Sequence, residues 1–69
     1  MTELAVKASD LLTTVQLATE RFNEGEPWYD YTQTVKSWLV LHLDESDVVL
    51  NEEVTLRYVM LRRELGLNI

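Results

Sequence analysis

The first third of the chain carries apolar residues at the spacing of one helical face. They recur in steps of four and three, at Leu4, Ala8, Leu11, Val15, Ala18 and Phe22. Such steps follow the 3.6-residue period of a helix and predict one over residues 2–23. In this helix Thr2 caps the start, and Glu3 and Lys7 form an i,i+4 ion pair. Gly25 is then expected to end the helix, because glycine readily adopts the left-handed backbone conformation that commonly follows a helix.

A second helix is predicted over residues 27–43. Pro27 suits the first helical turn, where its missing N–H needs no partner. The apolar stripe consists of Trp28, Tyr31, Val35, Trp38 and Leu39 and continues to His42 or Leu43. We expect the helix to end near Leu43, because the acidic segment 44–47 follows.

A third helix is predicted over residues 51–65. Asn51 is a good N-cap, and Glu53 with Arg57 forms an i,i+4 ion pair. Gly66 stands where a helix commonly ends in a left-handed residue. Residues 48–50, Val-Val-Leu, are ambiguous between an early helical turn and a short extended segment. A lone strand has nothing to pair with, so we favour helix or loop there.

These elements predict one all-α domain over residues 1–69, a three-helix antiparallel bundle. A chain of this length buries only about 60% of the surface that its unfolded form exposes, so its core is marginal. It has no Cys and one His, which excludes disulfides and a zinc site built from its own residues. A second apolar stripe runs along helix 51–65 through Leu56 and Met60 and begins with Val49 just before it. We therefore expect completion by homodimerisation, or docking of another protein on Leu56 and Met60.

The charge of the chain narrows the class of partner. Its formal net charge is −6 and its pI is near 4.5. This composition argues against direct nucleic-acid binding and against anionic membrane surfaces. It favours a protein partner, either basic or itself DNA-binding. The sequence shows no N-terminal signal peptide, in which basic residues precede an apolar segment, and no apolar run long enough to cross a membrane. This indicates a cytoplasmic protein.

No residue pattern predicts an enzyme, a cofactor or a metal site. His42 lacks a recognisable nucleophile or acid partner and is better explained as a helix-end residue. The segment from Asp44 resembles a calcium loop only superficially, since Val48 and Val49 stand where an oxygen ligand and the glycine are required.

Aromatic residues crowd the start of the second predicted helix. Trp28, Tyr31 and Trp38 share one face, which we assign to the core, although the cluster could instead be a surface. Tyr29 points elsewhere and is the aromatic that we expect to be exposed and available to a partner, because Tyr is enriched at interface hot spots.

An acidic segment is the other candidate contact surface. Asp44, Glu45 and Asp47 lie close together with no intervening base, and a second acidic group surrounds Gly25. The leading hypothesis is a small acidic protein-binding module that occupies a surface on a larger macromolecule. It would act as an inhibitor or adaptor, of the kind that phages direct at host nucleic-acid-handling or defence proteins. The alternatives are a DNA-mimicking inhibitor and a self-assembling structural subunit.

Overall fold

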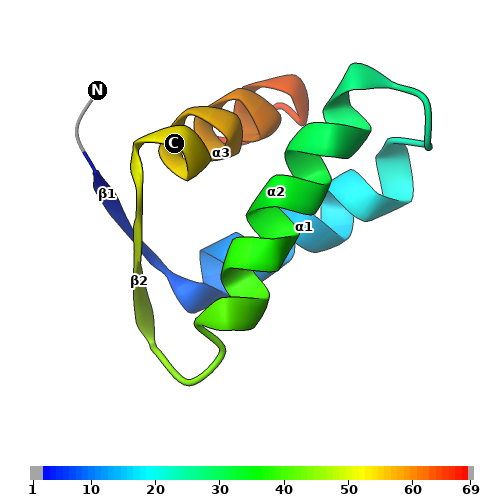
Figure 1. The fold of residues 1–69 in the computed structure, drawn as a ribbon. Coiled ribbons are helices and arrows are strands. Elements are labelled where there is room, and N and C mark those ends of the chain that lie inside the picture. The colour runs from blue at the N-terminus through cyan, green and yellow to red at the C-terminus, as the bar shows by residue number, and fades with distance from the viewer. Residues whose placement is uncertain (1–2, 69) are drawn as a thin grey trace.

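The computed structural model describes residues 3–68, which form three helices and a two-stranded sheet (Figure 1). The order is β1 (Leu4–Lys7), α1 (Ala8–Arg21), α2 (Pro27–Leu41), β2 (Asp47–Leu50) and α3 (Glu52–Glu64). The three predicted helices and a mostly helical fold are confirmed, whereas the prediction of an all-α domain did not include the small sheet. Within residues 3–68, none of the helices combines the length and the apolar character needed to cross a membrane.

The sheet corrects two sequence predictions. Residues 48–50 form a strand rather than a helix or loop, and their partner is a segment that was predicted to be helical. β1 and β2 pair antiparallel, with Leu4 opposite Leu50 and Lys7 opposite Asp47. Lys7 is thus a strand residue, so the predicted i,i+4 helical pair with Glu3 is wrong. The predicted cap Thr2 lies outside the described residues.

The sheet has one buried and one exposed face because side chains alternate along a strand. Val48 and Leu50 are fully buried, whereas Val49 between them is 51% exposed. Leu4 and Val6 of β1 pack against the same core. The hydrophobic pattern therefore fixes the register, since a slip by one residue would expose both buried side chains of β2.

The helix ends largely follow the local sequence. Pro27 begins α2, and the Asn51 side chain accepts a hydrogen bond from the backbone N–H of Val54 at 2.8 Å. Gly66 has a φ of 78°, and the next N–H, of Leu67, donates to the carbonyl of Arg62 at 2.7 Å. This is the glycine-terminated helix end that was predicted. α2, however, ends at Leu41 instead of Leu43, and His42 is its C-cap.

The core lies between the three helices and the inner face of the sheet. Its buried apolar members are Leu11, Val15, Ala18, Phe22, Val35, Leu39, Val48, Leu50, Val54, Tyr58 and Leu61. Trp28, Tyr31 and Trp38 are half-buried and pack against this cluster, so their assignment to the core face is confirmed. Tyr29 is half-buried as well, and it is not part of this packing.

Buried hydroxyls and one arginine complete the packing. The hydroxyls of Thr14, Thr32 and Thr55 each donate to a backbone carbonyl, which satisfies them inside the core. Arg62 of α3 donates through Nη1 to the Oγ1 of Thr14 in α1 at 2.8 Å. The same guanidinium donates through Nε to the carbonyl of Asn68 at 2.6 Å. Arg62 therefore ties α3 to α1 and holds the last described residues.

Candidate functional site

A groove between α1 and α2 collects exposed apolar side chains. It has a volume of about 670 Å³. Its lining residues come from α1 and from α2 with the turn that follows it: Leu12, Val15, Gln16, Thr19, Glu20, Lys36, Leu39, Val40 and Leu43. We call this feature the α1–α2 groove. Its position follows from the antiparallel packing of the two helices, which run side by side in Figure 1.

The α1–α2 groove has a buried floor and exposed walls. Val15 and Leu39 form the floor and belong to the core. Leu12, Val40 and Leu43 form the walls and are 44%, 56% and 66% exposed. Isolated exposed apolar residues are normal on a protein surface, but a contiguous group of them over one groove is typical of an interaction site.

Two of the three wall residues, Leu12 and Val40, belong to apolar doublets in the sequence. Leu11 and Leu12 are adjacent, as are Leu39 and Val40. Successive residues of a helix point about 100° apart, so one member of each doublet enters the core and the other lies at its margin. Because α1 and α2 pack against each other, Leu12 and Val40 border the same groove.

The two ends of the groove differ in charge. At one end Glu20 of α1 and Lys36 of α2 offer charges of opposite sign. At the other end Leu43 is followed directly by the acidic residues Asp44, Glu45 and Asp47, all of them exposed. We call these three residues the acidic loop. The groove therefore has polar lining residues toward the end with Glu20 and Lys36, and it borders negative charge at the end where Leu43 lies.

The acidic loop is held in place by side chains of α2. His42 and Glu45 share a hydrogen bond between Nδ1 and Oε2. The His42 ring lies 4.8 Å from the Trp38 ring, centroid to centroid, and the Trp38 indole N–H donates to the carbonyl of Val49 at 3.1 Å. These contacts join the end of α2 to β2 across the loop. They give His42 a structural part in closing the turn, as expected for a helix-end residue.

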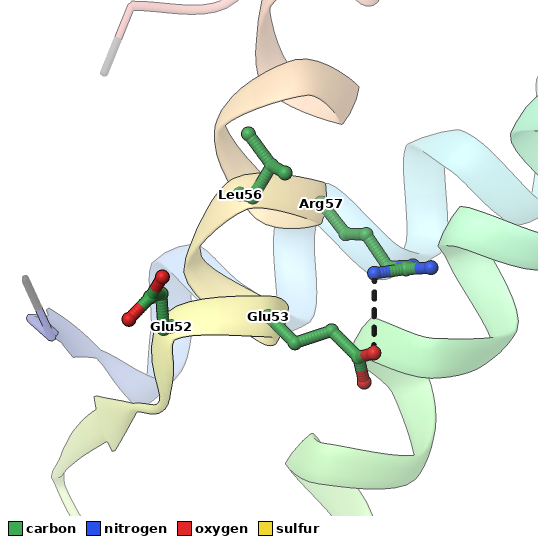
Figure 2. A pocket seen from close by; sticks show the side chains of 4 residues that line it. All are labelled: Glu52, Glu53, Leu56 and Arg57. Atoms are coloured by element: carbon green, nitrogen blue, oxygen red, sulfur yellow. Dashed lines mark ion pairs between the residues drawn. The ribbon is translucent and has the colours of Figure 1, made fainter. Parts of the chain in front are cut away.

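A second, smaller hollow surrounds the first turns of α3 (Figure 2). Glu52, Glu53, Leu56 and Arg57 line it, and its volume is about 400 Å³. Arg57 reaches toward α2, where its guanidinium lies 5.3 Å from the ring centroid of Tyr31, and it pairs with Glu53 at 3.6 Å. The predicted i,i+4 pair is thus confirmed, and Arg57 helps to hold α3 on α2.

The predicted partner-binding residues do not form one surface. Leu56 is 45% exposed on α3, as expected, whereas Met60 is half-buried and lines a hollow beside Trp28. Tyr29 is half-buried rather than freely exposed. The predicted second stripe of the third helix is divided as well, since Val49 belongs to β2. The acidic loop lies at the start of β2, whereas Leu56 lies on α3, which follows the end of β2.

Sequence reasoning did not single out Leu12 or Val40, although their signal was present in the apolar doublets, because two adjacent helical residues cannot both lie in one narrow stripe. It placed Leu43 on the apolar stripe of the second helix, whereas Leu43 is 66% exposed in the turn after α2. Within residues 3–68, no group of three or more His, Asp or Glu side chains is arranged to hold a metal ion.

Comparison with known proteins identifies no relative. No protein-family model matches the sequence, and neither a curated protein nor a solved structure matches the chain. The function must therefore be argued from the geometry and the chemistry of the surface.

Proposed function

We propose that this chain is a small acidic protein-binding module that acts by occupying a surface on a larger macromolecule, as an inhibitor or adaptor. The α1–α2 groove is its docking surface. The observation that carries the proposal is the convergence of Leu12, Val40 and Leu43, all substantially exposed, over a floor that belongs to the core. A wall of apolar side chains rimmed by charge is the surface chemistry of a protein-binding site.

The magnitude of the available burial supports a binding role. Full burial of one such side chain is worth about 1.5–3 kcal/mol. The exposed fractions of Leu12, Val40 and Leu43 together correspond to somewhat more than one and a half side chains, so covering them contributes about 2.5–5 kcal/mol before ordering costs. A micromolar complex requires about 8 kcal/mol, so the groove supplies a substantial part and the charged rim must add to it.

The experiment uses two matched double variants. The groove variant is Val40→Gln with Leu43→Gln, and the control variant is Leu17→Gln with Leu41→Gln. Leu17 and Leu41 are also exposed apolar residues, on α1 and α2, but they do not line the groove. Both pairs exchange exposed apolar side chains for the same neutral amide, so they differ chiefly in position.

Tagged wild-type protein and both variants are used to capture partners from an extract of the source cells, at low and at high salt, with identification by mass spectrometry. We expect a partner that the wild type and the control variant retain and the groove variant loses. A partner that is lost at high salt but is indifferent to the groove variant would favour DNA mimicry through the acidic residues instead, because exposed charges are screened by salt.

Homodimerisation is a second candidate. The observation that favours it is that Val49 and Leu56, on the adjoining elements β2 and α3, remain about half exposed. These belong to the stripe for which the sequence predicted a second copy. Sedimentation velocity of the wild type and of Leu56→Gln tests it: a dimer that Leu56→Gln converts to monomer is the expected result, and a wild-type monomer at high micromolar concentration contradicts it.

A further inference from the structure

We propose that the α1–α2 groove receives an amphipathic helix of a partner protein, with Lys or Arg at the end that lies beside the acidic loop. This inference rests on the proposed function and specifies the kind of partner. It follows from three properties of the groove: its length, the nature of its walls, and the uneven charge at its two ends.

The length of the groove fits two turns of helix. Its α1 wall runs from Leu12 to Glu20, which at 1.5 Å per residue is about 12 Å. Apolar anchors at positions i, i+4 and i+7 of a bound helix span a closely similar distance, about 10.5 Å. A helix of about two turns can therefore lie along this wall with apolar side chains against Leu12, Val40 and Leu43.

The nature of the walls also favours a helix over an extended peptide. Both walls are the sides of helices, whose backbone groups are already paired within α1 and α2. They offer an incoming strand no free sheet edge with which to pair. A helical occupant satisfies its own backbone hydrogen bonds and needs only side-chain contact from the groove.

The charge beside Leu43 selects a basic end for that helix. Asp44, Glu45 and Asp47 follow the groove at this end. The C-terminus of α2 lies here too, and the last turn of α2, all of it described, contains no basic residue to offset the negative end of the helix dipole. Lys7 stands opposite Asp47, and His42 shares a hydrogen bond with Glu45. Three carboxylates against one lysine still leave this end negative, so cationic side chains placed here are attracted and acidic ones are repelled.

A second copy of the chain is a poorer occupant. Each copy carries a net charge of −6, and Lys36 is the one basic residue that lines the groove. Stable dimers bury about 800 Å² on each partner, whereas the exposed apolar part of this groove consists of three side chains. Charge and area thus both favour a short basic helix over self-association at this site.

The test uses three fluorescein-labelled 18-residue peptides and fluorescence anisotropy. The first has Leu on one helical face and Lys elsewhere, the second replaces Lys by Glu, and the third is a scrambled Leu–Lys sequence without an amphipathic face. We expect the Leu–Lys helix to bind the wild type and the control variant alike, and to bind the groove variant at least tenfold more weakly. The scrambled and Leu–Glu peptides should also bind at least tenfold more weakly.

The contribution of the acidic loop is tested separately. Asp44→Asn with Asp47→Asn should weaken the Leu–Lys helix at least threefold, whereas neutralising two distant exposed carboxylates, Glu24→Gln with Glu64→Gln, should change binding less. Circular dichroism establishes that every variant retains the helical fold. Equal effects of the two neutralised pairs would mean that only net charge matters, and this would overturn the assignment of the basic end.

Other outcomes also overturn the inference. Equal binding of the groove and control variants, binding of the Leu–Glu peptide, or no binding of any peptide would each contradict it, as would a wild-type dimer that the groove variant dissociates. If every peptide fails while capture from the extract still depends on the groove, the proposed function stands and only the basic helix is wrong. If no peptide binds and capture from the extract does not depend on the groove, both proposals are wrong.

Discussion

Replacing Val48 or Val49 by alanine tests the packing and register of the small sheet. The two valines are neighbours on β2, but Val48 is fully buried and Val49 is 51% exposed. A Val→Ala change removes two buried carbons at about 0.8 kcal/mol each, and the cavity left behind raises the cost, so we expect Val48→Ala to lose about 1.5–3 kcal/mol. Val49→Ala shares the loss of β-propensity but leaves no cavity, and should cost about 0.5 kcal/mol or less.

Urea unfolding followed by circular dichroism measures both free energies of unfolding. A domain of this size has a total stability of about 3.5–10 kcal/mol, so the Val48→Ala loss is a large fraction of it. The midpoint of thermal unfolding should fall by roughly 6–20 °C for Val48→Ala and by only a few degrees for Val49→Ala. Equal losses, or a larger loss at Val49, would refute the register, because a slip by one residue exchanges the buried and exposed valines.

Three further predictions concern the stability that α3 gains from its two ends and from the hydrogen bonds of Arg62. Asn51→Ala should lower the free energy of unfolding by about 1 kcal/mol, because it removes the side-chain acceptor for the Val54 N–H. Asn51→Asp keeps an acceptor and should cost less, and urea unfolding of the two variants tests this difference. Gly66→Ala should cost about 1 kcal/mol because φ is 78° there, and thermal unfolding that shows no loss would contradict the left-handed helix end. Arg62→Met should lower the free energy of unfolding by about 1–2 kcal/mol, because it removes the hydrogen bonds to Thr14 and Asn68. Amide hydrogen exchange at the end of the chain should become faster in this variant.

The helices could be predicted from the sequence because their signals are local. Pro27, Asn51 and Gly66 each act within one turn of their own position, and each does so in the structure as predicted. The i,i+4 pair of Arg57 with Glu53 is local in the same sense. Such features depend on the backbone geometry of a single element and not on what packs against it.

The strands could not be recognised in the same way because each of them needs a distant partner. Leu4 continues the helical spacing of Ala8 and Leu11, so the sequence predicted that residues 4–7 begin a helix. The sequence gives no clear alternation there, because Val48, Val49 and Leu50 are all apolar, and the alternation of buried and exposed residues exists only in the folded strands. Only the pairing of Leu4 with Leu50, far apart in sequence, makes either segment a strand.

The α1–α2 groove could not be predicted from the sequence for a related reason. The sequence shows which residues are apolar, but exposure depends on how the helices pack. The second apolar stripe of the third helix predicted that Met60 is exposed, but its side chain is half-buried in the structure. Leu12, Val40 and Leu43 face a common groove only because α1 and α2 are antiparallel neighbours. The acidic loop was predicted as a contact surface, and the structure adds that it adjoins this groove at Leu43.

The most direct test of the central claim is an NMR titration of the ¹⁵N-labelled protein with the Leu–Lys helical peptide. If the α1–α2 groove is the docking surface, the largest shift changes fall on amides of its lining residues, with Leu12, Val40 and Leu43 among them, and extend into the acidic loop. Changes centred on Leu56 and Met60, or spread evenly over all acidic residues, would contradict the account.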